Sequence, residues 1–200
     1  LPLPGAHNAQ NLLASSALAL GVGVSTAEIK KGLPCFTSLL GRTEIHVLPN
    51  KVTVLCDYYN ANPASMVAAF SLLLELEKKA KASMKETFPP KKPCRWLCLG
   101  DMLELGTVEE TLHRELAKPI LAAGFEQTLL FGPRMRCLEK ELKQRNYSGQ
   151  VRHFETKTAL VTALSQGLQT GDLVLIKGSR GMEMEKIWEE FRGFKTSPPP

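Results

Sequence analysis

The sequence predicts an α/β domain with a doubly wound, mainly parallel β-sheet, preceded by a helical segment. Short apolar runs alternate five times with longer amphipathic segments between about residue 51 and residue 191. The runs are continuously apolar, which is typical of parallel strands that are buried on both faces. An alternation of this kind favours a sheet that is covered by helices on both sides.

The first segment, residues 8–33, has a helical pattern. Ser25 is followed three residues later by Glu28, which is the spacing of a capping box, so we expect a second helix to begin there. Gly32 and Pro34 then end that helix. Because the chain begins without Met, we expect it to start partway through a longer protein.

From Glu44 onward the pattern changes to alternating strands and helices. The predicted strands cover residues 51–56, 96–99, 128–131, 151–154 and 173–176. The helix after the first strand begins at Pro63 with Asn62 as its N-cap, because asparagine accepts a hydrogen bond from a free N–H group and proline lacks one. The other helices cover residues 108–122, 135–144, 158–168 and 183–191.

We therefore predict three regions: a helical region with a hinge at residues 1–43, the α/β domain at 44–194, and a tail at 195–200 that cannot pack. Ligands of doubly wound domains sit beyond the carboxyl ends of the strands. Here those ends lead into four loops, at residues 57–62, 100–106, 132–133 and 177–182.

Composition argues against several classes of protein. The chain of 200 residues is 44% hydrophobic and 22% charged, as ordinary globular proteins are, and it contains no apolar run long enough for a transmembrane helix and no signal peptide. Its net charge of +5 is concentrated between Lys78 and Lys92, which we interpret as a solvated insertion and not a nucleic-acid-binding face. The five cysteines are scattered along the chain, so we expect them to be small core residues of a protein in a reducing compartment and not ligands of a zinc ion.

The first two loops contain candidate binding residues. Asp57 lies where the first strand stops, and a carboxylate there can accept two hydroxyl hydrogen bonds from a ribose. The alternative, a plain turn and helix cap, leaves the two tyrosines and two asparagines of this loop unexplained. In the second loop, Asp101 and Glu104 could bind an ammonium group or orient a base, but composition alone favours capping of the next helix.

The loop at residues 177–182 combines two cations and a hydroxyl with the start of a helix. Exposed backbone N–H groups there, together with Lys177, Ser179 and Arg180, suit a carboxylate or a phosphate. No GxxxxGK[ST] motif occurs anywhere in the chain, and no GxGxxG follows the first strand, which argues against a P-loop and against a NAD site. His113, a lone histidine in the helix after the second loop, reads as structural.

Four segments, taken in order, resemble the Mur ligase family. They are Gly5-Ala6-His7-Asn8 through Asn11, Tyr59-Asn60-Ala61-Asn62-Pro63 with Ser65-Met66, Gly100-Asp101-Met102 with Glu104-Leu105-Gly106 and His113, and Lys177-Gly178-Ser179-Arg180 with Met184-Glu185. The resemblance implies that residues 1–43 end the family's central ATP-binding domain and that residues 44–194 form its Rossmann-like C-terminal ligase domain. One position departs from the family pattern, which commonly has an acid where this chain has Cys56.

The resemblance also implies roles for individual residues. Asn8 and Asn11 would approach the adenine of a nucleotide. Arg42 would reach its phosphates, and Asp57 would bind its ribose hydroxyls. Three catalytic residues would lie near the incoming dipeptide and the reacting centre: Lys177, Ser179 and Arg180. The implied substrate-binding residues are Tyr59, Asn60, Asn62, Asp101 and Glu104, and no residue is assigned to a metal.

The implied activity is that of an ATP-dependent peptide ligase in peptidoglycan precursor synthesis. Such an enzyme adds D-alanyl-D-alanine to UDP-N-acetylmuramoyl-tripeptide after ATP has converted the tripeptide carboxylate to an acyl phosphate. Mg²⁺ would be held mainly by the central domain, and without its P-loop we expect this chain not to ligate by itself. The resemblance further implies a monomer that neither binds nucleic acid nor inserts into a membrane, located in the cytoplasm, or in the plastid if the source is a plastid-bearing eukaryote.

Two alternatives stay open. One is a non-catalytic module that binds an amino acid or a nucleotide and derives from such a ligase domain; the truncated helical start argues against a stand-alone module. The other is an unrelated dehydrogenase of the dinucleotide-binding type, against which the absent glycine fingerprint argues.

Overall fold

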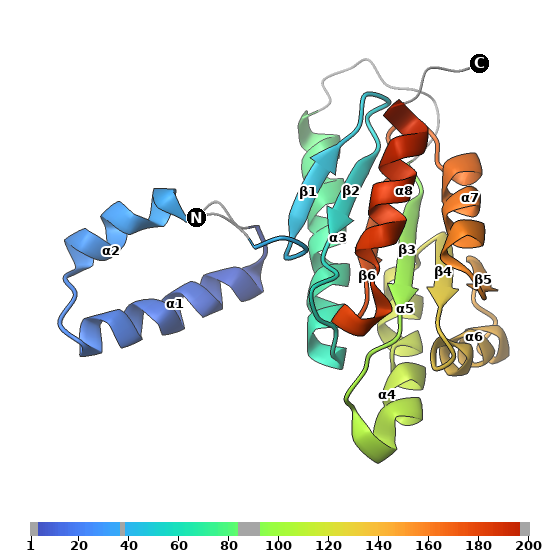
Figure 1. Cartoon of the computed structure of the whole chain (residues 1–200), viewed down its shortest axis with the longest axis horizontal. Coiled ribbons are helices and arrows are strands. Elements are labelled where there is room, and N and C mark those ends of the chain that lie inside the picture. Colours follow the sequence, from blue (N-terminus) through green and yellow to red (C-terminus); the bar gives the residue numbers. More distant parts are fainter. Residues whose placement is uncertain (1–3, 37–38, 84–92, 197–200) are drawn as a thin grey trace.

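The computed structural model describes residues 4–36, 39–83 and 93–196 (Figure 1). Its α-helices are α1 Ala6–Gly21, α2 Thr26–Gly32, α3 Pro63–Ser83, α4 Glu109–Glu115, α5 Ala117–Ala123, α6 Met135–Gln144, α7 Lys157–Gly167 and α8 Glu185–Thr196. Short 3-10 helices are η1 Leu33–Cys35, η2 Gly106–Val108 and η3 Arg180–Met182. The strands are β1 Glu44–Val47, β2 Thr53–Cys56, β3 Arg95–Gly100, β4 Gln127–Phe131, β5 Gln150–Phe154 and β6 Leu173–Lys177.

The strands form one sheet in the order β1-β2-β6-β3-β4-β5. Strands β2 to β6 pair in parallel, and β1 pairs with β2 in antiparallel orientation. This confirms the predicted α/β fold with a mainly parallel sheet. Strand β1 was not among the predicted strands, because its residues alternate between half-buried and exposed over a length of only four residues. So short a half-exposed run at a sheet edge lacks the continuous apolar pattern of the central strands.

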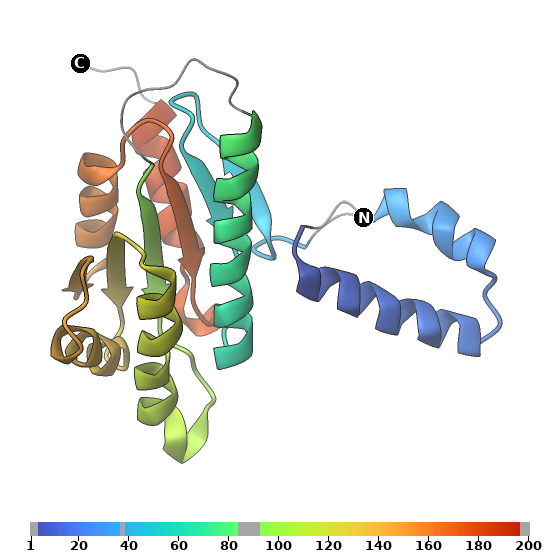
Figure 2. The same cartoon turned by 180° about the vertical axis from the view of Figure 1, so that it is seen from behind.

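Helices cover both faces of the sheet, as the strand pattern predicts. Figure 1 shows α7 and α8 in front of the strands, and Figure 2, seen from behind, shows α3 and α5 on the other side. Neighbouring residues of a strand point to opposite faces. Accordingly Leu97 and Leu99 of β3 pack in the cluster with α3, α5 and α6, whereas Trp96 and Cys98 pack with α7 and α8.

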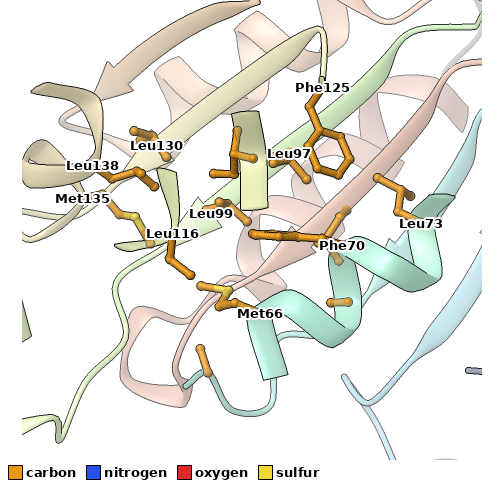
Figure 3. Close-up of a cluster of buried hydrophobic side chains, with 14 of the residues drawn as sticks. Met66, Phe70, Leu73, Leu97, Leu99, Leu116, Phe125, Leu130, Met135 and Leu138 are labelled. Atoms are coloured by element: carbon orange, nitrogen blue, oxygen red, sulfur yellow. The ribbon is translucent and has the colours of Figure 1, made fainter. Parts of the chain in front are cut away.

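Helix α3 supplies much of the core on the face shown in Figure 3. Met66, Phe70 and Leu73 recur at helical spacing along α3 and are almost fully buried beside Leu97 and Leu99 of β3 (Figure 3). Burying each of these side chains contributes roughly 1.5–3 kcal/mol to the stability of the fold. This packing holds α3 against the sheet and so fixes the loop between β2 and α3.

Helices α1 and α2, with η1, form an arm, residues 6–36, that projects from the α/β domain (Figure 1). The predicted capping box is present: the Ser25 hydroxyl accepts from the Glu28 N–H, and the Glu28 carboxylate accepts from the Ser25 N–H. None of the residues of α2 is buried. The conformation of the arm therefore depends on local helix capping and on the contact between α1 and α2 more than on a buried core of its own.

Three predicted boundaries were wrong for identifiable backbone reasons. The helix predicted at 108–122 is two helices, α4 and α5, because Pro119 in the first turn of α5 has no N–H to continue the hydrogen bonds of α4. Helix α8 begins at Glu185 and not at 183, because Glu183 has a left-handed φ of 49°. Strand β2 begins at Thr53, since Lys51 has a φ of 61°.

Helix α8 also continues to Thr196, two residues into the predicted tail. The rest of that tail, residues 197–200, lies outside the described residues. The same holds for residues 84–92, which make up most of the predicted lysine-rich insertion. Its first part, from Lys78 to Ser83, belongs to α3.

Two cysteine side chains are buried on either side of β6 and give a prediction for alkaline pH. Cys56 of β2 and Cys98 of β3 are both in register with Ile176, both are free thiols, and both are fully buried. Burial raises the pKa of each thiol far above its ordinary value of 9.0. Above pH 9 the unfolded chain therefore loses these protons while the folded protein keeps them.

We expect the free energy of unfolding to fall as the pH rises above 9. The stabilisation from each thiol is complete below pH 9 and is lost toward the raised pKa, by up to about 1.4 kcal/mol per pH unit. Denaturant unfolding in the presence of a reductant, between about pH 8 and pH 10.5, measures the slope. The slope of the double variant Cys56→Ala/Cys98→Ala should be shallower, and an equal slope in both proteins would refute this account.

Candidate functional site

A pocket of about 510 Å³ lies between the arm and the carboxyl ends of β2 and β6. The wall contributed by the arm includes apolar side chains: Leu12, Ile29, Leu33 and Phe36. The wall contributed by the α/β domain and the segment before it is mainly polar and charged, with Leu39 and Ala68 as its apolar members; its polar residues are Arg42, Thr43, Asp57, Asn60, Asn62, Ser65 and Lys177. A concave site with an apolar wall and a few converging polar groups is typical of a small-molecule pocket.

The segment from Gly41 to Glu44 connects the arm to the sheet, and backbone hydrogen bonds hold it against the first loop. The Gly41 N–H donates to the Glu44 carboxylate at 2.6 Å, and the Gly41 carbonyl accepts from the Tyr59 N–H at 2.9 Å. Gly41 has a φ of 72°, and a Cβ there would lie 2.6 Å from the Tyr58 ring. Only glycine fits this position without strain.

Lys177 and Asp57 form a buried ion pair at the base of the pocket. Lys177 Nζ lies 2.6 Å from Asp57 Oδ2, and the lysine side chain is only 2% exposed. Lys177 Nζ also donates to the carbonyl oxygens of Asp57 and Asn60, at 3.1 and 2.9 Å. Burial lowers the pKa of Lys177, and the neighbouring carboxylate opposes that shift.

This pair ties the segment from Gly41 to Glu44 to the end of β6. All three N–H donors of Lys177 are engaged within the protein, so the lysine shapes the loop after β2. Asp57 Oδ1 accepts from the Thr43 N–H at 3.1 Å, which links the same carboxylate to that segment. The predicted catalytic role of Lys177 and the predicted ribose contact of Asp57 stay predictions.

Ser179 is likewise held within the protein. It is almost fully buried, its hydroxyl oxygen accepts from the Leu103 N–H at 2.8 Å, and the hydroxyl donates to the Ala61 carbonyl at 3.3 Å. One side chain thus connects the loops after β2, β3 and β6. A direct role of Ser179 at a reacting centre stays a prediction.

Gly178 lets the backbones after β3 and β6 approach each other. A Cβ at Gly178 would lie 2.8 Å from Met184 Cγ and 3.1 Å from Gly100 Cα. Real Cβ contacts are essentially never as short as 2.8 Å. The glycine therefore allows Lys177 and Ser179 to sit directly against the loop that follows β3.

Asp101 and Glu104 lie outside the pocket lining. Asp101 is fully buried, and its two oxygens accept from the backbone N–H groups of Arg134 and Met135 at the start of α6. Glu104 is exposed and has a left-handed φ of 63°. Asp101 therefore caps a helix, although α6 and not the next helix in the chain, while substrate binding by either acid stays a prediction.

His113 has a structural position, as the sequence suggested. It is fully buried, and its Nε2 accepts from the Met102 N–H at 3.0 Å. Its Nδ1 lies 2.7 Å from the Glu109 carbonyl, to which it must donate if Nε2 accepts. The ring thereby fixes the loop that begins at Gly100.

The Tyr59 ring lies against two arginine side chains. The guanidinium carbon of Arg42 is 4.3 Å from the ring centroid, and that of Arg180 is 5.6 Å from it. Tyr59 is 40% exposed, whereas its neighbour Tyr58 is buried beneath Gly41. The predicted residues Tyr59 and Arg180 thus lie beside the pocket rather than in its wall.

The predicted asparagines lie in the pocket wall. Asn62 caps α3 as predicted: its side-chain oxygen accepts from the Ser65 N–H at 2.9 Å, and the Ser65 hydroxyl accepts from the Asn62 N–H. Asn8 donates from its side chain to the Pro4 carbonyl at 2.7 Å. Asn60 Oδ1 accepts from the Ala61 N–H at 2.8 Å.

The pocket unites seven of the residues predicted from the sequence: Asn8, Asn11, Arg42, Asp57, Asn60, Asn62 and Lys177. It does not include Tyr59, Asp101, Glu104, Ser179 or Arg180. Sequence reasoning missed its apolar wall and Thr43. The recurrence of Leu12, Ile29 and Leu33 across two predicted helices was the available signal, but it did not show which face would meet the α/β domain.

In the described part of the chain, no helix is both long and apolar enough to cross a membrane. Among the same residues, no group of three or more histidine, cysteine or acidic side chains comes together in a way that could hold a metal ion.

Comparison with protein families gives one match over most of the chain. The profile described as "Mur ligase, glutamate ligase domain" matches residues 41–180. This range contains the whole sheet and every predicted site residue except Asn8 and Asn11.

Individual relatives and a solved structure agree with that match. UDP-N-acetylmuramoyl-tripeptide–D-alanyl-D-alanine ligase of Escherichia coli is 34% identical over 94% of this chain and 37% of its own length. The enzyme of that name from Bacillus subtilis is 31% identical over 94% of this chain and 38% of its own length. A crystal structure of MurF from Acinetobacter baumannii superposes with a TM-score of 0.77 at 25% identity and covers 96% of this chain and 39% of that one. The chain thus spans less than two fifths of the length of these relatives.

Proposed function

The chain belongs to the Mur ligase family, and from this premise we propose that it acts as the C-terminal part of an ATP-dependent ligase. The proposed reaction adds D-alanyl-D-alanine to UDP-N-acetylmuramoyl-tripeptide, as the names of its relatives describe for those proteins. One observation carries the proposal. The pocket between the arm and the α/β domain brings together all four residues assigned to the nucleotide: Asn8, Asn11, Arg42 and Asp57.

The chemistry of the pocket wall suits a nucleotide. Its apolar part, from Leu12 to Phe36, can cover the flat face of a base, and the asparagines supply hydrogen bonds to its edge. Each oxygen of Asp57 accepts one hydrogen bond within the protein, which leaves a further lone pair on each for a ribose hydroxyl. The cation of Arg42 lies in the same wall and can pair with a phosphate.

The described residues of this chain suit a nucleotide better than they suit Mg²⁺, since they bring no cluster of three metal-binding side chains together. We therefore propose that the ion is held mainly by the central domain of the whole enzyme. When bound, Mg²⁺ would neutralise phosphate charge during acyl phosphate formation.

The proposed contribution of this chain is orientation and exclusion of water. In the whole enzyme, ATP would phosphorylate the tripeptide carboxylate, and the dipeptide amine would then attack the acyl phosphate and release phosphate. The amine is a weak nucleophile and must be held close to the acyl carbon. Closure at the hinge, residues 41–44, would bring Arg180 and the loop after β6 to that centre and shield the acyl phosphate from water.

The exposed surface of the arm supports the proposed division into domains. Leu13 and Leu18 of α1 are 70% and 74% exposed, and Leu40 after the arm is 70% exposed. So many large apolar side chains on one small element suit contact with further protein. We propose that residues 1–43 end the central ATP-binding domain and that residues 44–194 form the C-terminal ligase domain, in a cytoplasmic or plastid enzyme that works as a monomer.

An NMR titration of the isotopically labelled chain tests the nucleotide assignment. AMP should shift the backbone signals of Thr43, Asp57 and Asn60 in a saturable way. The analogue 2′,3′-dideoxy-AMP should bind about tenfold or more weakly, because it lacks both hydroxyls that Asp57 would accept, each worth roughly 1.5–3 kcal/mol. Equal affinity for the two nucleotides, or no saturable shift with AMP, would contradict the assignment.

The dipeptide assignment is tested in the same sample. D-alanyl-D-alanine should shift signals in the loops at Tyr59 and Arg180, and L-alanyl-L-alanine at the same concentration should not. Equal responses to the two stereoisomers would count against a dedicated dipeptide site. In neither case do we expect ligation by this chain alone, because its sequence lacks a P-loop.

A further inference from the structure

Arg42 and Arg180 come from distant parts of the chain and meet at one aromatic ring. Arg42 precedes β1, whereas Arg180 begins η3 after β6. Their guanidinium carbons lie 4.3 and 5.6 Å from the centroid of the Tyr59 ring. Both distances are within the range of about 6 Å in which a cation is attracted to the face of an aromatic ring.

Among the described residues, 4–36, 39–83 and 93–196, no acidic side chain neutralises these two cations, Arg42 and Arg180, by an ion pair. The nearby Lys177 differs, because its charge is balanced by Asp57. Two like charges repel each other, so holding them beside one ring favours a ligand that carries negative charge.

Tyr59 is itself held firmly enough to position both cations. Its N–H donates to the Gly41 carbonyl at 2.9 Å, which anchors the ring next to the hinge. Tyr58 directly before it and Ala61 two residues after it are each 2% exposed, so the loop is anchored in the core before and after the exposed pair Tyr59 and Asn60. The ring therefore projects from a rigid loop, while the arginines are long side chains that lose freedom by lying against it.

We propose that Tyr59 is a positioning residue that gathers Arg42 and Arg180 into one binding site for a phosphate-type polyanion. This inference rests on the proposed function and deepens it. It states that the Tyr59 ring holds Arg42 of the hinge and Arg180 of the loop after β6 close together. The two guanidiniums supply planar pairs of N–H donors, the geometry that matches phosphate oxygens. Binding of one polyanion by both would also draw the hinge and that loop together.

The test compares the binding of inorganic tripolyphosphate by the whole 200-residue chain and two variants, using calorimetry at low salt. Tyr59→Phe keeps the aromatic face and should bind within about twofold of the unaltered chain. Tyr59→Leu removes the face and should bind about fivefold or more weakly, because each exposed cation–π contact is worth roughly 0.5–1 kcal/mol. Thermal unfolding of both variants should match that of the unaltered chain, since Tyr59 is partly exposed.

A double-variant cycle separates positioning from a general structural effect. In the Arg42→Gln/Arg180→Gln background, Tyr59→Leu should weaken tripolyphosphate binding no further. A Tyr59→Leu variant that binds as tightly as the unaltered chain, or an equal loss of affinity in that background, would overturn the inference. The absence of saturable tripolyphosphate binding by the unaltered chain would overturn it as well.

Adenosine serves as a second ligand that distinguishes this inference from the proposed function. It carries no phosphate, so its binding should depend on Asp57 and the apolar wall and should be unchanged in Tyr59→Leu. Normal adenosine binding without an effect of Tyr59 on tripolyphosphate would refute the inference alone. If the unaltered chain binds neither adenosine nor tripolyphosphate, the proposed nucleotide site is refuted as well.

Discussion

Replacing Lys177 with methionine should lower the free energy of unfolding by about 3 kcal/mol. The substitution leaves the Asp57 carboxylate without its cation and the carbonyls of Asp57 and Asn60 without a donor. Breaking a buried ion pair by removing one partner costs about 3–5 kcal/mol, and the lower end applies because the Asp57 side chain is 20% exposed. Urea unfolding monitored by tryptophan fluorescence measures the change.

Lys186→Met is the matched control for that experiment. Lys186 is exposed and pairs with Glu183 three residues earlier in the chain, so its removal should cost far less than the removal of Lys177. Adding Asp57→Asn to Lys177→Met should restore part of the lost stability, because it removes the unpaired charge. If Lys177→Met costs no more than Lys186→Met, the pair does not hold the loop after β2 as described.

Replacing Asp101 with alanine should cost about 2–4 kcal/mol. Its buried carboxylate accepts from the Arg134 and Met135 N–H groups at 3.2 and 2.9 Å, and the Arg134 guanidinium lies 3.7 Å away. Alanine would leave buried N–H groups at the start of α6 without an acceptor, at about 1–3 kcal/mol for each buried group. The helix dipole adds to the loss, because a negative charge at a helix N-terminus is stabilising.

Hydrogen exchange shows whether that loss is local. The amides of Arg134 and Met135 should exchange faster in Asp101→Ala, while amides of β2 should change only with global stability. Glu110→Ala is the control, since Glu110 is an exposed acid whose pair with Arg114 is worth less than about 1 kcal/mol. Unchanged exchange at Arg134 and Met135 would show that Asp101 does not cap α6.

The central strands and most helices could be predicted from the sequence because their signals are local. Continuous apolar runs such as residues 173–176 are buried on both faces in the structure, and Ser25 and Asn62 form the predicted helix caps. Strand β1 escaped prediction because a four-residue edge strand has only one partner and a half-exposed pattern. The break at Leu116 depends on Pro119, which interrupts the helix although the apolar pattern continues across it.

For the candidate site too, local features could be predicted from the sequence, whereas contacts between distant residues could not. Residue type and position after a strand were enough to select Asp57 and Lys177, because parallel strands bring their carboxyl ends to one edge of the sheet. Arg42 and Asn60 were implied by the resemblance to the Mur ligase family. Residue type and position did not reveal that the Lys177 ammonium group donates hydrogen bonds to Asp57 and Asn60, or that Asp101 caps α6. Those partners are separated by tens of residues in the chain, and nothing local encodes them.

The sequence by itself determined the α/β class, the loops at 57–62, 100–106 and 177–182 that carry polar residues, and the family to which they belong, since each depends on residue types at short spacing. Only the tertiary structure decided which polar groups are already paired and which face the pocket. It also decided that the arm supplies the apolar wall and that Arg42 and Arg180 both lie against the Tyr59 ring. The reason is that hydrogen bonds and ion pairs depend on the distances between side chains. The order of residues in the chain does not determine those distances until the sheet and its loops have formed.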